Sequence, residues 1–169
     1  MDEDIIVIDN FLPSIEFKRL KNKLISHEFP WFFFNLVDTV EDISNPSKFQ
    51  FQHHFYEHCR WKSSFHPNIF EDVEIKLQPK SWLRIKANLQ VRDPVAEFNT
   101  FHVDVEGCNT PYRTGILYLN TCNGQTKFEG GTVVYSVENR FISFPGHLKH
   151  TGKASTDVRR ILLNFCWFE

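Results

Sequence analysis

The sequence predicts a mainly β (α+β) fold, a jelly-roll barrel with N-terminal supporting helices. Aromatic residues make up 15% of the chain, and 18 of its 169 residues are Phe. Such residues pack well on the pleated, half-buried surface of a sheet. From Trp82 onward, short runs of β-forming residues are separated by turn signals, which is typical of an all-β sandwich or barrel. The helical pattern comes before these runs, which favours a barrel with helical support.

The N-terminal half is expected to contain short strands and two helices. Pro13 opens a helix over 14–26, in which Leu20 and Leu24 recur at helical spacing. We interpret this helix as a cover for a sheet, without chemistry of its own. The other expected elements are strands over 5–10, 29–40 and 49–56, a loop over 42–47 and a short helix within 67–77.

The second half is expected to form the barrel itself. Its turn signals are Arg92-Asp93-Pro94, Gly107, Asn123-Gly124, Gly130-Gly131, Glu138-Asn139 and Pro145-Gly146. A chain of 169 residues is long enough for one domain with a sizeable core. We therefore expect a single domain over 1–169, with the strand and helical support in 1–80 and the barrel core in 81–169.

Charge and cysteine usage exclude several classes of protein. The formal net charge is −2 with both signs spread along the chain, so neither a basic stripe nor a nucleic-acid partner is indicated. No apolar run reaches membrane-spanning length, and the acidic start lacks the features of a signal peptide. The four cysteines form no C-x-x-C pair, and we interpret them as free thiols in a reducing, cytoplasmic compartment.

A metal site is indicated by the H-x-D motif formed by His102, Val103 and Asp104. Residues two apart on a strand point to the same side, so the imidazole and the carboxylate would aim at one point. His150, further along the chain, supplies a second imidazole. Two imidazoles and one carboxylate on one face of a metal form the facial triad typical of iron(II), with other coordination positions open. His147 is the competing choice for the second histidine.

A carboxylate-binding site is indicated by Arg160, which opens an alternating run of residues. On a strand, Arg160 and Asn164 share a face, and a guanidinium can hold a carboxylate through two parallel hydrogen bonds. Asn164 could add a donor, whereas Arg159 would point the opposite way. The hydroxyl of Tyr118 could reach the same carboxylate, or Tyr118 could be an ordinary core aromatic residue.

Taken in order, these motifs resemble the iron(II)/2-oxoglutarate-dependent oxygenases, in particular their prolyl-4-hydroxylase-like branch. The resemblance covers about half of the chain. The matching stretches are 84–89, 101–104, 115–120, 128–132, 139–144, His150 and 160–165. The resemblance implies a double-stranded β-helix, a jelly-roll, cupin-like barrel with the metal in its mouth.

The resemblance also implies cofactors, site residues and a reaction. Fe(II) would be bound by His102, Asp104 and His150. The co-substrate 2-oxoglutarate would chelate the metal and would be bound by Arg160, Tyr118, Asn164 and, on a weaker match, Asn88, with Arg159 as the alternative to Arg160. The expected activity is that of a dioxygenase that uses O2, with ascorbate in a supporting role, and hydroxylates a substrate while 2-oxoglutarate is decarboxylated to succinate and CO2.

The prime substrate is not specified by the sequence. A prolyl residue is favoured by the resemblance alone, and a peptide or a metabolite is the general expectation. The loops over 90–100 and 106–113 flank the H-x-D motif and are expected to face the substrate. Two other functions remain open, a metal-dependent hydrolase on the same barrel and a jelly roll that binds a ligand without catalysis.

Overall fold

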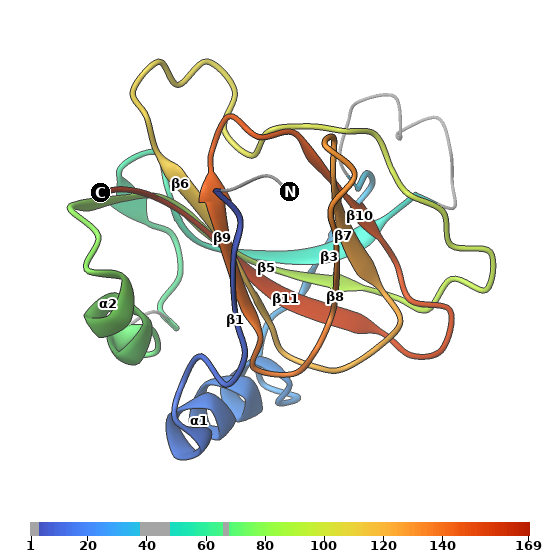
Figure 1. The fold of residues 1–169 in the computed structure, drawn as a ribbon. Coiled ribbons are helices and arrows are strands. Elements are labelled where there is room, and N and C mark those ends of the chain that lie inside the picture. The colour runs from blue at the N-terminus through green and yellow to red at the C-terminus, as the bar shows by residue number, and fades with distance from the viewer. Residues whose placement is uncertain (1–3, 38–47, 66–67) are drawn as a thin grey trace.

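Antiparallel strands are the predominant regular structure in the computed structural model, which describes residues 4–37, 48–65 and 68–169 (Figure 1). The helices are α1 (Ser14–Leu24) and α2 (Glu71–Leu77). The strands are β1 (Ile6–Ile8), β2 (Phe32–Phe34), β3 (Gln50–Glu57), β4 (Arg60–Trp61), β5 (Ser81–Gln90), β6 (Arg113–Tyr118), β7 (Gln125–Phe128), β8 (Val133–Tyr135), β9 (Phe141–Pro145), β10 (His150–Lys153) and β11 (Arg160–Phe168).

The strands form two sheets. The larger sheet has the order β1-β9-β6-β11-β5-β3-β2, with β4 paired to β3, and the smaller sheet has the order β10-β7-β8. In Figure 1 the helices lie at the lower left of the view and the smaller sheet lies to the right. The two longest strands, β5 and β11, are neighbours near the middle of the larger sheet, with Arg160 paired to Gln90.

Side chains alternate between the two faces of the larger sheet along β11, so this strand contributes to two hydrophobic cores. Ile161, Leu163 and Phe165 join a core that also contains residues of α1 and α2. Leu162 points the other way, into a second core formed with Phe128 and other residues of the smaller sheet. Because successive side chains of a strand point to opposite faces, the polar side chains at even positions of β11 must also lie between the two sheets.

The two helices have identifiable limits. In α1, Phe17, Leu20 and Leu24 are buried, as expected for an amphipathic helix that covers a sheet. It ends two residues before the predicted limit. α2 ends at Gln78, whose φ of 46° places it in the left-handed conformation that often terminates helices. This helix confirms the short helix predicted within 67–77, although residue 67 lies outside the described residues.

The predicted strands near the N-terminus are shorter in the structure. The strand expected over 5–10 is β1, and the strand expected over 29–40 is only the three-residue β2. Phe29 is buried in the aromatic core, and Pro30 has no N–H to donate to a neighbouring strand, so pairing begins after Pro30. Residues 38–40 and the loop predicted over 42–47 lie outside the described residues.

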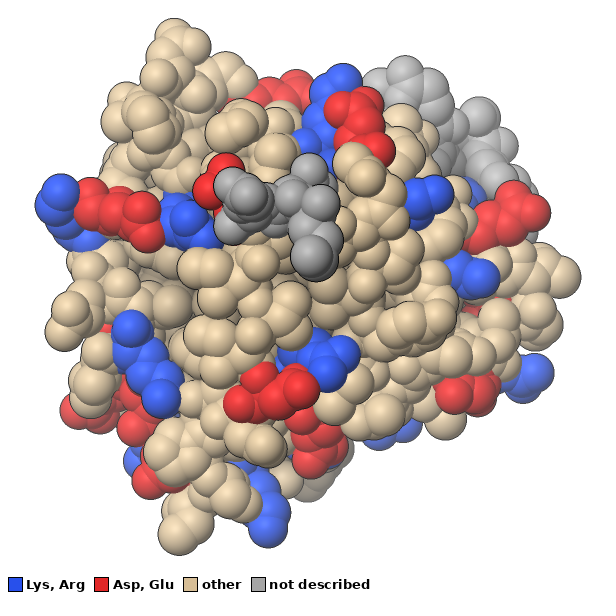
Figure 2. Space-filling view, in the orientation of Figure 1, with Lys and Arg blue, Asp and Glu red and all other residues tan. Residues whose placement is uncertain are grey.

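Charged side chains are spread over the surface. On the face drawn in Figure 2, acidic and basic side chains are interspersed and do not gather into an area of one sign. Several of them pair across elements, for example Arg140 with Asp9 and Arg19 with Asp72. Within the ranges that the structure describes, neither helix is long and apolar enough to cross a membrane.

Candidate metal and co-substrate site

A small polar cavity lies between the two sheets, where the inner faces of β5 and β11 meet β10. Its volume is about 50 Å³. Six of the seven predicted site residues line it, together with other polar side chains. The lining residues are Gln50, Lys86, Asn88, Gln90, His102, Asp104, Ile116, Thr126, His150, Gly152, Arg160, Leu162 and Asn164.

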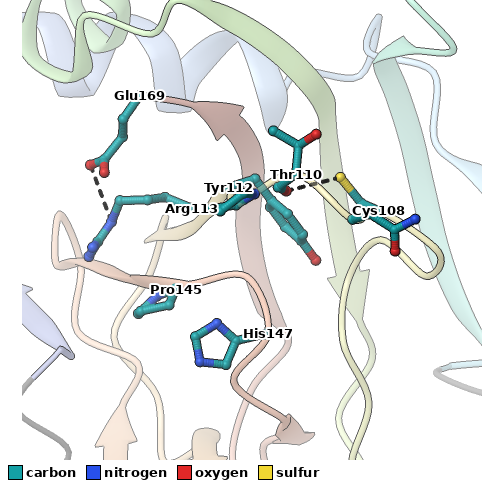
Figure 3. Close-up of a pocket in the computed structure, with 9 residues that line it drawn as sticks. Cys108, Thr110, Tyr112, Arg113, Pro145, His147 and Glu169 are labelled. Carbon is teal, nitrogen blue, oxygen red and sulfur yellow. Dashed lines mark hydrogen bonds and ion pairs between the residues drawn. The ribbon is translucent and has the colours of Figure 1, made fainter.

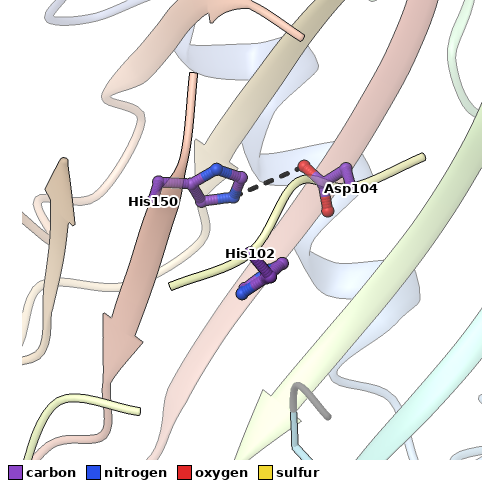
Figure 4. Close-up of side chains that lie close together, drawn as sticks. All are labelled: His102, Asp104 and His150. Atoms are coloured by element: carbon purple, nitrogen blue, oxygen red, sulfur yellow. Dashed lines mark ion pairs between the residues drawn. The ribbon is translucent and has the colours of Figure 1, made fainter. Parts of the chain in front are cut away.

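The three predicted metal ligands converge at one end of this cavity (Figure 4). One potential ligand atom from each of His102, Asp104 and His150 lies within 4.8 Å of the others. His150 begins β10, and its Nε2 is 3.5 Å from Oδ2 of Asp104. The ring centroids of the two histidines are 4.8 Å apart. Among the described residues this is the one cluster of three such groups that could hold a metal ion.

The H-x-D segment is not a strand, contrary to the sequence prediction. His102 forms only an isolated bridge with His150, through reciprocal backbone hydrogen bonds of 3.0 Å. Asp104 lies in a bend that leads into the following loop. The two side chains therefore do not owe their common direction to strand alternation. Pairing with β10 fixes the imidazole, and side-chain contacts fix the carboxylate.

Both imidazoles are oriented by backbone carbonyls. Nδ1 of His102 is 3.2 Å from the carbonyl oxygen of Thr100, and Nδ1 of His150 is 3.3 Å from that of Leu148. A carbonyl accepts only, so this contact fixes the proton on Nδ1 and leaves Nε2 as the ligand atom. Burial lowers the pKa of His150, which favours the neutral imidazole that a metal requires.

The carboxylate of Asp104 is buried and ionised. Burial alone would raise its pKa, but the neighbouring positive groups, Arg84 above all, hold the pKa well below its usual range. Arg84 donates to Oδ1 of Asp104, and Nδ2 of Asn164 donates to Oδ2 at 2.9 Å. A buried carboxylate beside two imidazoles matches the donor set of an iron(II) facial triad.

Arg160 lies at the other end of the cavity and is 2% exposed. Three of its five N–H groups donate to neutral acceptors: Nε to Ser136 at 2.8 Å, Nη1 to Gln90 at 3.1 Å and Nη2 to Thr126 at 2.8 Å. No carboxylate among the described residues forms an ion pair with it. A buried cation without a counter-ion is costly, so this guanidinium is suited to an anionic ligand.

Tyr118 contacts both Thr126 and Arg160 at this end of the cavity. Its hydroxyl donates to Oγ1 of Thr126 at 2.8 Å, and the guanidinium of Arg160 lies 5.5 Å from the centroid of its ring. Burial raises the pKa of Tyr118, which keeps the hydroxyl protonated as a donor. Thr126, and not Tyr118, is among the residues that line the cavity. Sequence reasoning did not identify Thr126, Ser136 or Gln90.

Two carbonyl oxygens in the cavity wall are buried and have no hydrogen-bond partner among the described residues, Oδ1 of Asn88 and Oε1 of Gln50. The amide of Gln50 is oriented by its Nε2, which donates to the carbonyl oxygen of Val37 at 2.6 Å. Buried polar atoms without partners are uncommon and point to a missing ligand or water. Asn88 lies on the inner face of β5, as the sequence suggested, whereas Gln50 was missed.

His147 and Arg159, the alternatives to His150 and Arg160, do not line this cavity. His147 lines a separate cavity of about 510 Å³, together with residues 108–113, Pro145 and Glu169 (Figure 3). It does not belong to the metal cluster. Arg159 is exposed, and its backbone carbonyl accepts from Asn120 at 2.8 Å. Strand alternation between Arg159 and Arg160 therefore separates the two arginines as the sequence predicted.

Gly124 leaves the space that Arg160 occupies. A Cβ at this position would lie 2.6 Å from Cδ of Arg160 and 3.1 Å from the carbonyl oxygen of Lys153. Gly124→Ala should displace the guanidinium and weaken the binding of an anionic ligand at Arg160 by about 10-fold, since overpacking commonly costs 1–3 kcal/mol. Metal affinity should stay within a factor of about two of wild type, and equal losses of both affinities would contradict this local effect.

Comparisons with known proteins support the fold. No family model and no curated protein matches the sequence. A 2OG-Fe(II) oxygenase-family oxidoreductase from Burkholderia pseudomallei has a similar structure at 11% identity, with a TM-score of 0.73 over 99% of this chain and 86% of that chain. A Trichoplax adhaerens prolyl hydroxylase, in complex with a hypoxia inducible factor peptide fragment, has a TM-score of 0.68 at 12% identity over 99% and 84% of the two chains.

A third protein of similar structure is described as an epimerase and not as a hydroxylase. It is a non-heme alpha ketoglutarate-dependent epimerase from nogalamycin biosynthesis, with a TM-score of 0.64 at 7% identity over 98% of this chain and 78% of that chain. At these identities the likeness concerns the fold. It confirms the predicted jelly-roll fold, which this chain shares with the three proteins.

Proposed function

We propose that this chain is an Fe(II)- and 2-oxoglutarate-dependent dioxygenase that hydroxylates an organic substrate. The observation that carries the proposal is the pairing, in one cavity, of a two-histidine, one-carboxylate cluster with a buried arginine that has no acidic partner among the described residues. A hydrolase would use the cluster but leaves the arginine unexplained. The fold shared with known oxygenases adds support.

Each residue has a defined role in this proposal. His102, Asp104 and His150 hold iron, and Arg160 holds the distal carboxylate of 2-oxoglutarate, with Thr126 and Tyr118 supporting it. Bound iron with 2-oxoglutarate supplies the oxidising chemistry, in which a C–H bond, O2 and 2-oxoglutarate give a C–OH bond, succinate and CO2. The protein orients these groups and excludes bulk water.

Binding requires some rearrangement of the cavity wall. A volume of about 50 Å³ holds roughly two water molecules. A five-carbon dicarboxylate therefore needs flexible lining side chains, such as those of Lys86 and Gln90, to move outward. Gln90 is the side chain most directly affected, because the bound carboxylate would replace its Oε1 as the acceptor for Nη1 of Arg160.

The substrate is proposed to be a peptidyl proline, with a small metabolite as the broader alternative. Support for proline comes from a similar structure that is described as a prolyl hydroxylase bound to a peptide fragment. The cavity adds one chemical requirement. The carbonyl oxygen of Gln50 has no donor among the described residues. 2-Oxoglutarate carries no hydrogen-bond donor at neutral pH, so a second ligand or a water molecule is needed to supply one.

The experiment that tests this function measures succinate. Purified protein is incubated with Fe(II), ascorbate and 2-oxoglutarate under air, with and without a set of proline-containing peptides and metabolites. Wild type should form succinate and His102→Ala should not, whereas Arg19→Met, which alters a surface ion pair between the helices, should behave as wild type. The absence of both succinate formation and 2-oxoglutarate binding in wild type would refute the proposal.

A further inference from the structure

Asp104 is held by the protein from two sides, and both partners come from the central strands of the larger sheet. Arg84 on β5 donates through Nη1 to the backbone carbonyl of Asp104 and through Nη2 to its Oδ1. Asn164 on β11 donates through Nδ2 to Oδ2 at 2.9 Å. Nη2 of Arg84 also donates to Oδ1 of Asn164 at 2.9 Å. Each of the three side chains is therefore bonded to both of the others.

We infer that Arg84 and Asn164 form a clamp that positions the Asp104 carboxylate for metal binding. This inference rests on the proposed function. It gives a role to Arg84, which had none in the sequence analysis, and a different role to Asn164, which was expected to bind 2-oxoglutarate. The clamp is needed because the H-x-D segment is not a strand, so backbone pairing does not fix Asp104 as it fixes His102. The carboxylate instead takes its orientation from two rigid neighbouring strands.

The geometry of the clamp leaves the carboxylate able to bind a metal. An ionised carboxylate has about four acceptor sites, of which Arg84 and Asn164 take one on each oxygen. Oδ2 still faces His150, 3.5 Å from its Nε2. The side chains of Arg84 and Asp104 are only 14% and 4% exposed, so water competes little for these hydrogen bonds. Each oxygen thus keeps an acceptor site that can be shared with a cation held by His102 and His150.

The clamp assigns Asn164 to the metal end of the cavity. Four residues of an extended strand span about 13 Å, which separates Asn164 from Arg160 along β11. In the structure the amide of Asn164 contacts Asp104, Arg84 and the thiol of Cys166. Its first role is thus to orient a metal ligand, and its expected contact with the distal carboxylate of 2-oxoglutarate is replaced by this one.

A purely electrostatic role for Arg84 would have the opposite effect. A guanidinium beside the site repels a metal cation, so its removal would tighten binding if charge alone mattered. If the forked hydrogen bonds matter, both Arg84→Met and Arg84→Lys should weaken binding, because lysine keeps the charge but lacks the planar fork. Outer-shell partners of metal ligands typically contribute 10- to 100-fold in metal affinity.

The test is a titration of the metal-free protein with Co(II), followed by calorimetry and by visible absorption, which reports the number and arrangement of the ligands. We expect Arg84→Met and Arg84→Lys to bind Co(II) about 10- to 100-fold more weakly than wild type, with an altered spectrum. Asn164→Ala removes one neutral donor and should weaken binding by about 10-fold. Arg19→Met, which removes an arginine from an ion pair outside the site, is the matched control and should bind as wild type.

Several results separate the clamp from the proposed function. Because Arg84→Met leaves a buried carboxylate unpaired, its fold is checked by circular dichroism, and Asn164→Ala keeps the test decisive if that variant does not fold. Wild-type affinity in Arg84→Lys and Asn164→Ala would overturn the clamp while leaving the metal site intact. Failure of wild type to bind Co(II) at all would overturn the metal site itself and the proposed function with it.

Discussion

Arg160→Met is expected to raise KM for 2-oxoglutarate by about 30- to 4,000-fold. The guanidinium is buried, and the loss of one partner from a buried, hydrogen-bonded charge pair costs about 2–5 kcal/mol, which corresponds to that range. The three neutral acceptors that now surround Arg160 cannot replace its charge. The affinity of the metal-free protein for Co(II) should be unchanged within about two-fold, because the metal ligands lie at the other end of the cavity.

Arg159→Met is the matched control for this experiment. Arg159 is the same residue type one position earlier, but it is exposed and directed away from the cavity. Its replacement should leave KM for 2-oxoglutarate at the wild-type value. If Arg159→Met abolished binding and Arg160→Met preserved it, the assignment of the carboxylate-binding arginine would be wrong, although the class of reaction would survive.

His150→Ala is expected to abolish metal binding and succinate formation. Even outer-shell partners of a metal typically contribute 10- to 100-fold in affinity, so the loss of a direct ligand should exceed about 100-fold. His150 also packs against Phe144, with ring centroids 4.8 Å apart, and its replacement leaves a cavity. His102→Ala, at a less buried ligand, gives the same test with a smaller effect on stability. Both are followed by Co(II) titration and by thermal unfolding.

His147→Ala is the control for the histidine assignment. It lies three residues before His150, in the wall of the separate cavity of about 510 Å³. Its replacement should leave Co(II) affinity and succinate formation at wild-type values. Loss of metal binding in His147→Ala, with binding retained in His150→Ala, would show that the ligand set had been assigned incorrectly.

The sequence predicted the elements whose side-chain pattern is set by local geometry. Alternation in β11 correctly directed Arg160 into the barrel and Arg159 out of it. Helical spacing predicted α1, and the covering role of this helix was also correct. These predictions succeeded because the direction of a side chain within a regular element follows from the period of that element.

The features that the sequence did not predict depend on contacts between distant residues. Residues Arg84, Lys86, Asn88 and Gln90 alternate along β5 with apolar ones, a pattern usually read as a strand with one solvent-exposed face. In the structure Lys86, Asn88 and Gln90 line the cavity between the two sheets, and Arg84 contacts Asp104. The role of Arg84 could not follow from the alternation alone, since Asp104 reaches it from an irregular segment twenty residues away.

The most direct test of the central claim is a calorimetric titration of 2-oxoglutarate into the protein under anaerobic conditions, with and without Mn(II) as a redox-stable substitute for Fe(II). The account predicts binding that is strengthened by the metal in wild type and lost in Arg160→Met, while His150→Ala loses only the part that depends on the metal. Binding that is the same with and without metal, or unchanged by Arg160→Met, would contradict a single cavity shared by iron and 2-oxoglutarate.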